Sequence, residues 1–202
     1  MLHSFNKLLK GYQRFREKYA SHEDSFMSNL AEQGQQPDCM VVACCDSRVD
    51  PALLLQCHPG ELFVIRNVAN IIPPFEMDGG HHGTSAALEF GICYLHVKHL
   101  IILGHSQCGG VRAKLNHIEL HQDDFISRWM DLIKINEEDS HDVDSYAQEA
   151  LINSYKNCLT FPWVKERLEQ NALTIHLWFF NIKDGAIYTY NFSHNAFEPL
   201  NK

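Results

Sequence analysis

Two short segments of this chain combine residue types that bind zinc. Cys44 is followed by Asp46 and Arg48, and His105 is followed three positions later by Cys108. Thiolate and imidazole groups form a ligand set that suits zinc, and three protein ligands leave a fourth position free for chemistry. The spacing therefore predicts a catalytic zinc site whose ligands are Cys44, His105 and Cys108.

Either segment alone has a simpler interpretation. Cysteine is often buried as a small apolar residue, so Cys44 and Cys108 could be ordinary core thiols, and His105 could simply line a turn. Two observations together favour the zinc site: both segments follow apolar runs, and Ser47 and Arg48 stand beside the first.

The apolar runs predict the strands that position these residues. Residues 39–43 and 100–103 are typical of buried parallel strands. Open α/β sheets bind ligands where the carboxyl ends of parallel strands meet the following loops, so both segments can converge on one ion. Side chains alternate in an extended chain, which places Cys44 and Asp46 on one face and Cys45 on the other. Cys45 is therefore not expected to be a ligand.

Further periodic segments predict the remainder of the fold. Apolar runs indicate strands at 62–65, 173–182 and 186–192, and Asp184-Gly185 is typical of a hairpin turn between the last two. Helical spacing predicts helices at 5–19, 84–95, 125–133, 146–155 and 162–170. A further helix is expected to begin at a cap formed by Ser21 and Asp24 and to reach about residue 33. Two more are expected to begin near residues 50–51 and after Gly109.

The alternation of strands and helices predicts an α/β fold. We expect a mainly parallel central sheet with an antiparallel edge strand, flanked by helices. Residues 1–202 should form one domain, with an N-terminal helical arm at 1–34 and an α/β core at 35–202. The apolar stripe of the first helix packs either on the chain's own core or on another subunit. The acidic run 136–142 contains no apolar residue and predicts a solvated loop.

Composition restricts the partners and the compartment. The formal net charge of −8 argues against nucleic-acid and membrane-surface partners. The sequence contains no twenty-residue apolar run and does not start with a signal-peptide pattern, so we expect a cytoplasmic protein. An odd count of seven cysteines, two of them adjacent, suits a reducing compartment. Four cysteines in apolar surroundings are expected to be small buried residues: Cys39, Cys57, Cys93 and Cys158.

Taken together, these segments resemble the β-class carbonic anhydrases, and their plant-like branch most closely. The segment from Cys44 to Arg48 matches the motif Cys-x-Asp-Ser-Arg, and the segment from His105 to Gly110 matches His-x-x-Cys-Gly-Gly. The resemblance extends over nearly the whole chain. Its other matching segments are 34–37 (GQQP), 59–61 (PGE), Phe63, 66–70 (RNVAN), 73–74 (PP) and 159–164 (LTFPWV).

The resemblance implies reversible hydration of CO₂ to bicarbonate and a proton, by attack of zinc-bound hydroxide, with one Zn²⁺ per chain. Arg48 is close enough in sequence to hold Asp46 bidentately, so that Asp46 orients the hydroxide. Alternatively, Asp46 ligates zinc in a closed state. In the family that state accompanies a regulatory bicarbonate site that needs a tryptophan in the first strand, where this chain has Val41. We therefore expect the open state.

The resemblance also implies substrate contacts. A glutamine amide donates a hydrogen bond to CO₂ or bicarbonate, apolar side chains line a cleft for the gas, and a backbone N–H of Gly109 or Gly110 can hold the product anion. As an alternative, the apolar residues are ordinary core residues. The positions concerned are Gln35, Phe63, Val68, Phe90 and Gly109, with Phe90 in place of the more usual tyrosine.

Other functions are open at this point. The same site could hydrolyse a CO₂ analogue such as carbon disulfide or carbonyl sulfide. The chain could also be a redox- or zinc-responsive binding protein, although structural zinc is usually enclosed by four protein ligands. In the resembling family the N-terminal helices embrace a partner, so a homodimer or homotetramer is expected.

Overall fold

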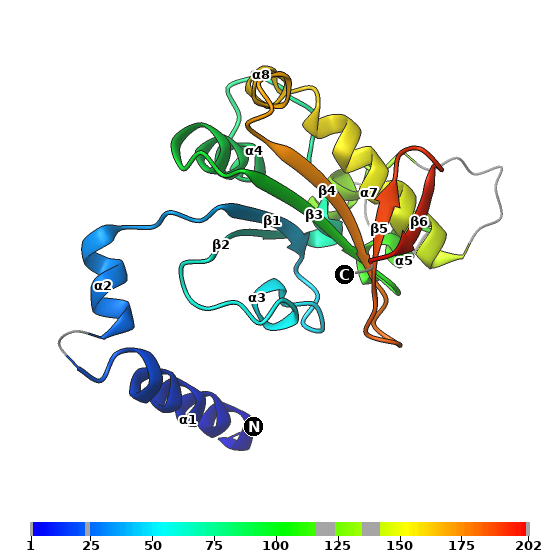
Figure 1. Ribbon diagram of the computed structural model, residues 1–202. Coiled ribbons are helices and arrows are strands. Elements are labelled where there is room, and N and C mark those ends of the chain that lie inside the picture. Colours follow the sequence, from blue (N-terminus) through cyan, green and yellow to red (C-terminus); the bar gives the residue numbers. More distant parts are fainter. Residues whose placement is uncertain (1, 23–24, 116–123, 135–141, 201–202) are drawn as a thin grey trace. The chain divides into compact units, whose positions relative to one another are not determined.

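The computed structural model describes residues 2–22, 25–115, 124–134 and 142–200. The chain divides into two compact units, Met1–Gln36 and Pro37–Lys202. The first unit contains helices α1 (Leu2–Tyr19) and α2 (Phe26–Gln33). The second contains the sheet and the other helices (Figure 1). The single-domain organisation stays a prediction.

A six-stranded sheet forms the centre of the second unit (Figure 1). Its order is β2-β1-β3-β4-β5-β6, in which the first four strands are parallel and the last two pairings are antiparallel. The expected fold class is therefore confirmed. The strand bounds are β1 (Cys39–Cys44), β2 (Leu62–Asn67), β3 (His99–His105), β4 (Thr174–Phe180), β5 (Ile187–Asn191) and β6 (Ala196–Pro199).

The antiparallel edge consists of two strands, β5 and β6, where the sequence indicated one edge strand. Strand β6 is only four residues long and ends at Pro199, so its sequence lacks the long apolar alternation that indicates a strand. Strand β6 forms because it pairs with β5, for example at Tyr190 and Phe197. Their rings lie 5.1 Å apart.

Short helices connect the strands and cover the sheet. Helix α7 packs along β3 and β4 (Figure 1). Among the described residues, no helix is both long and apolar enough to span a bilayer. The helices of this unit are α3 (Pro51–Leu54), the 3₁₀ helix η1 (Val68–Asn70), α4 (Gly83–Glu89), the π-helix η2 (Phe90–Tyr94), α5 (Gly109–Leu115), α6 (Phe125–Met130), α7 (Val143–Cys158) and α8 (Pro162–Glu169).

Two helix predictions need correction. The cap of α2 is Ser25, whose side chain accepts a hydrogen bond from the backbone N–H of Ser28. Ser21 instead donates its hydroxyl hydrogen to the carbonyl oxygen of Glu17 at the end of α1. Asp24 of the expected cap lies outside the described residues, as do residues 136–141 of the expected acidic loop.

The expected helix 84–95 changes type along its length. It is α-helical to Glu89 and continues as the π-helix η2. The wider turn brings Gly91 against β1, where an added Cβ would lie 2.7 Å from the sulfur of Met40. This close packing is a tertiary constraint that helical spacing in the sequence does not record.

Strands β1 and β3 form the buried centre of the sheet. Val41, Val42 and Ile102 are fully buried, and the two strands run parallel in direct register. Their carboxyl ends therefore lie next to each other at one edge of the sheet. The residues that follow these ends form the candidate site.

Candidate metal centre

The three predicted zinc ligands meet at the ends of β1 and β3. Cys44 is the last residue of β1, His105 is the last residue of β3, and Cys108 directly precedes α5. Their ligand atoms all lie within 4.8 Å of one another. All three residues are buried, with exposed fractions of 5%, 1% and 1%. The structure thus brings together three donors from two loops that are about sixty residues apart in sequence.

The imidazole of His105 presents a free nitrogen to this cluster. Its Nδ1 donates a hydrogen bond to the carbonyl oxygen of Ser106 at 2.9 Å, which leaves the lone pair on Nε2. Within the described part of the chain, Nε2 is buried and has no hydrogen-bond partner. An unpartnered buried polar atom is costly, and a metal ion would satisfy it.

The two thiols also fit a divalent cation. The neighbouring Cys108 thiol and His105 ring, together with the backbone N–H of Ala69, lower the pKa of Cys44 to about 4, against the opposing effect of burial. The Cys44 thiolate and burial raise the pKa of Cys108 well above its usual value. Two negative charges repel each other in this buried site, and a dication removes that penalty.

The carboxylate of Asp46 lies beside the cluster and is held by Arg48. The guanidinium donates from Nε to Oδ1 at 2.9 Å and from Nη2 to Oδ2 at 2.7 Å, and the backbone N–H of Arg48 also donates to Oδ1 at 2.9 Å. These bonds hold the pKa of Asp46 well below its usual range. Its Oδ2 lies 4.0 Å from Nε2 of His105. A fixed, ionised carboxylate therefore faces the three candidate ligands.

Arg66 in β2 fixes the loop that follows β1. Its Nε donates to the carbonyl oxygen of Cys44 at 3.0 Å and its Nη2 to that of Asp46 at 2.7 Å. Its Nη1 forms an ion pair with Asp50 at 3.0 Å. Sequence reasoning placed Arg66 only within a matching family segment and gave it no role. The available signal was a single cation directly after four apolar residues of the strand.

A close approach of α5 to η1 completes the wall of the site. A Cβ added to Gly110 would lie 2.7 Å from Cγ1 of Val68 and 3.4 Å from Cβ of Ala69. Glycine at this position, two residues after Cys108, lets the start of α5 pack against the turn whose Ala69 N–H contacts Cys44. Gly109 itself is exposed at the start of α5.

Other predicted site residues lie farther from the donors or in another unit. The rings of Phe63 and Phe90 lie 5.9 Å apart, so these two residues are neighbours. Phe63 pairs with Met40, which precedes Cys44 by four residues in β1. That register places Phe63 about 13 Å along the strand from the donors. Gln35 belongs to the first unit, and its substrate role stays a prediction.

Two of the five other cysteines show how the non-ligand thiols differ. Cys45 is exposed, and its backbone N–H continues the pairing with β2 by donating to Asn67. Cys158 is fully buried, and burial raises the pKa of its thiol to about 12. Cys39, Cys57 and Cys93, which we expected to be buried, are half-buried.

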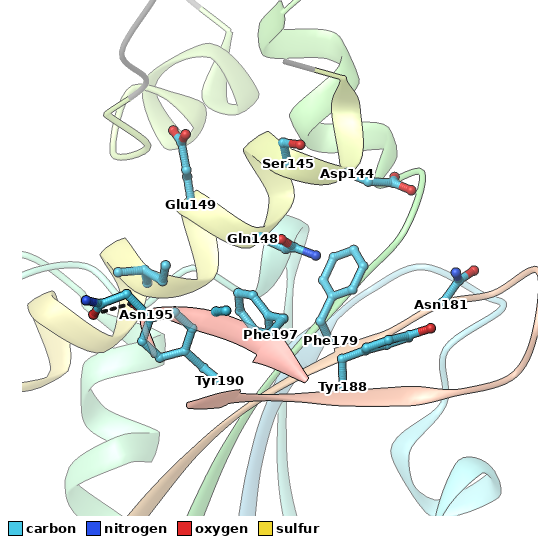
Figure 2. Close-up of a pocket in the computed structure, with 12 residues that line it drawn as sticks. Asp144, Ser145, Gln148, Glu149, Phe179, Asn181, Tyr188, Tyr190, Asn195 and Phe197 are labelled. Atoms are coloured by element: carbon cyan, nitrogen blue, oxygen red, sulfur yellow. Dashed lines mark hydrogen bonds between the residues drawn. The ribbon is translucent and has the colours of Figure 1, made fainter. Parts of the chain in front are cut away.

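A separate pocket of about 540 Å³ lies between α7 and the strands β4 to β6 (Figure 2). Its walls combine carboxylates with aromatic rings, for example Glu149, Tyr188 and Phe197. None of the predicted site residues lines it. It is therefore separate from the candidate metal centre.

Comparison with known proteins agrees with the geometry. The family model described as carbonic anhydrase matches residues 39–187. The chain belongs to the β-carbonic anhydrase family. A carbonic anhydrase of Synechocystis sp. is 34% identical over 201 residues, which cover 92% of this chain and 70% of the relative. The chloroplastic β-carbonic anhydrase 5 of Arabidopsis thaliana is 33% identical over 89% of this chain and 62% of its own length.

Solved β-carbonic anhydrases share the fold. The structure of the β-carbonic anhydrase CcaA is similar with a TM-score of 0.85 at 30% identity, over 98% of this chain and 93% of that one. A structure from a study of two tetrameric β-carbonic anhydrases of Sordaria macrospora is similar with a TM-score of 0.70 at 29% identity, over 92% and 93%. The fold and the family are thus established together.

Proposed function

We propose that this protein catalyses the reversible hydration of CO₂ to bicarbonate and a proton, as a zinc-dependent β-carbonic anhydrase. The observation that carries the proposal is the buried cluster of Cys44, His105 and Cys108 beside the Asp46–Arg48 pair. Family membership supports the same reaction. A merely structural zinc site would need neither a free coordination position nor a fixed carboxylate beside it.

One zinc ion per chain is held by Cys44, His105 and Cys108 in this proposal. The donor set fits because two thiolates balance the charge of the ion and the free Nε2 of His105 supplies the third ligand atom. When bound, the ion lowers the pKa of a water molecule and so supplies hydroxide near neutral pH, as it does in carbonic anhydrases with three histidine ligands.

Asp46 orients the attacking group. Because Arg48 holds its pKa low, the carboxylate is ionised at neutral pH and can accept a hydrogen bond from the hydroxide. Such a bond would let Asp46 orient the attacking oxygen toward the carbon of CO₂. Both carboxylate oxygens accept hydrogen bonds from Arg48, which supports the open state, in which Asp46 is not a zinc ligand. Val41 in β1, in place of a tryptophan, supports it as well.

The substrate site is proposed to be shared between copies of the chain. Val68 and Gly109 lie next to the residues that hold the metal, whereas Phe63 lies about 13 Å away along β2 and its ring is 5.9 Å from that of Phe90. The latter pair can line a cleft at a metal site only if that site belongs to a neighbouring subunit. A similar structure described as tetrameric supports a homodimer or homotetramer. We assign Gln35 to the same cleft between subunits.

The cytoplasm is the proposed location, because seven cysteines with an adjacent pair suit a reducing compartment. Cell fractionation tests it, and recovery of the protein in a membrane or secreted fraction would oppose it.

The function itself is tested by stopped-flow CO₂ hydration of the full chain, with metal analysis of the same sample. We expect turnover that requires about one zinc per chain and rises toward alkaline pH. Release of sulfide from carbonyl sulfide or carbon disulfide is measured in parallel. Sulfide release without CO₂ hydration would replace the proposed substrate, and zinc binding without either activity would reduce the site to a structural one.

A further inference from the structure

Gln107 lies between two of the metal-holding residues, His105 and Cys108, in a strained conformation. Its φ of +54° is in the left-handed region, which non-glycine residues adopt at an energetic cost. A residue held in that conformation needs contacts that fix it. The contacts of Gln107 therefore matter for the loop that presents both ligands.

Asp144, 37 residues away in sequence, provides these contacts. Its Oδ1 accepts hydrogen bonds from the backbone N–H of Gln107 at 2.6 Å and from the side-chain Nε2 at 3.0 Å. Arg112 donates to the other end of the amide, at Oε1. Both the backbone and the side chain of Gln107 are thus fixed.

The start of α7 fixes Asp144 in turn. Asp142 caps this helix and accepts hydrogen bonds from the backbone N–H groups of Asp144 and Ser145, both at 3.0 Å. Figure 2 shows Asp144 in the first turn of α7, at the end of the pocket between this helix and the hairpin. The carboxylate is therefore presented from a rigid helix terminus rather than from a loop.

The carbonyl oxygen of Gln107 connects this anchor to the Asp46–Arg48 pair. Nη2 of Arg48 donates to that oxygen at 3.2 Å and to Oδ2 of Asp46 at 2.7 Å. A continuous series of hydrogen bonds therefore runs from Asp144 through Gln107 and Arg48 to Asp46. Removing the first member frees the Gln107 peptide to rotate away from Arg48.

We propose that Asp144 is a positioning residue for the reaction: it holds the Gln107 peptide so that its carbonyl oxygen orients Arg48, and thereby Asp46. This inference rests on the proposed function. Asp144 does not contact the substrate in this account and acts only through Gln107. Its removal should lower kcat with little change in KM.

The first test compares three variants of the full chain. Asp144→Ala should lower kcat per bound zinc by about tenfold, within the range of up to a hundredfold that small misplacements cause. Asp144→Asn keeps an acceptor oxygen and should recover most of the rate. Asp142→Ala loosens the helix turn that presents Asp144 but leaves the Asp144 carboxylate able to accept from Gln107, so it should lower stability and reduce kcat per zinc by clearly less than Asp144→Ala. Equal losses in Asp142→Ala and Asp144→Ala would overturn the proposal.

The second test is a double-mutant cycle with Arg48→Ala. If Asp144 acts through Arg48, Asp144→Ala should have no further effect on kcat in the Arg48→Ala background. The same tenfold loss in both backgrounds would overturn the proposal, because independent effects multiply.

A third measurement does not depend on activity. Amide hydrogen exchange of the segment 104–110 should be faster in Asp144→Ala than in Asp142→Ala, in both zinc-loaded and zinc-free protein. Unchanged exchange in Asp144→Ala would contradict the anchor. If the wild-type protein does not hydrate CO₂, the proposed function fails, while the exchange experiment still decides whether Asp144 holds the loop.

Discussion

Arg48 holds the carboxylate of Asp46 through two parallel hydrogen bonds, of 2.9 Å to Oδ1 and 2.7 Å to Oδ2. This geometry requires a planar donor with two N–H groups. Lysine cannot reproduce it, because its ammonium group is a single point of charge. The side chain of Arg48 is half exposed, so its contribution should concern orientation rather than stability.

Arg48→Lys should therefore lower CO₂ hydration by roughly tenfold to a hundredfold, while the protein keeps its zinc. The physical reason is that Asp46 loses its fixed orientation, whereas the three donors are untouched. Stopped-flow rates with metal analysis measure both quantities. A variant with full rate would show that the bidentate pair has no catalytic role.

The adjacent cysteines provide a matched pair. Cys44→Ser should abolish stoichiometric zinc binding and activity, because the hydroxyl is a poor substitute for a thiolate ligand. Cys45→Ser changes an exposed side chain on the other face of the strand and should alter stability by at most about 0.5 kcal/mol. Metal content and turnover of the two variants, prepared in parallel, decide this. Loss of zinc in Cys45→Ser would show that the assignment of Cys44 rather than Cys45 as the ligand is wrong.

Much of this centre is predictable from sequence, because its donors directly follow continuous apolar strands. The distance of Phe63 from the candidate metal ligands was not predictable, since it depends on the register of Phe63 with Met40. The contact of Asp144 with Gln107 joins residues 37 positions apart and leaves no local pattern. Strand β6 and the π-helix η2 likewise exist because of pairing and packing partners rather than because of their own sequence.

Zinc uptake should release protons and become tighter as pH rises. Cys44, with its pKa lowered to about 4, is already a thiolate at neutral pH. Cys108 has a raised pKa and must lose a proton to bind the ion. Burial lowers the pKa of His105, but the nearby Cys44 thiolate outweighs this effect and raises the pKa above its ordinary value, so any proton that Nε2 of His105 holds must also leave when zinc binds. Calorimetry in buffers of different ionisation enthalpy counts these protons, and an affinity that is constant between about pH 6 and 8 would contradict the prediction.

Gly110→Ala should destabilise the protein by about 1–3 kcal/mol, which is typical of overpacking. The added methyl group would lie 2.7 Å from Cγ1 of Val68, so η1 or α5 must shift. Gly109→Ala is the matched control, because nothing lies within 4 Å of its added Cβ. Urea unfolding of both variants measures the difference, and equal midpoints would show that the close approach is not needed.

The shared substrate site predicts complementation between two defective subunits. Gln35→Ala should weaken catalysis and leave zinc content intact, whereas Cys108→Ser should lose zinc. In a mixed oligomer, a Gln35→Ala subunit supplies an intact metal centre and its Cys108→Ser neighbour supplies an intact Gln35. Co-expression followed by separation of the hybrid should yield activity well above that of either parent. Hybrids no more active than their parents would place Gln35 in the same subunit as the metal it serves, or outside the site.

The central claim is that sulfurs from two separate loops and one ring nitrogen bind a single zinc ion on which turnover depends. The most direct measurement is zinc stoichiometry and CO₂ hydration of wild-type protein and Cys108→Ser, purified side by side. The account predicts about one zinc per chain with rapid turnover for the wild type, and loss of both in the variant. A Cys108→Ser protein that retains its zinc and its full rate would contradict it.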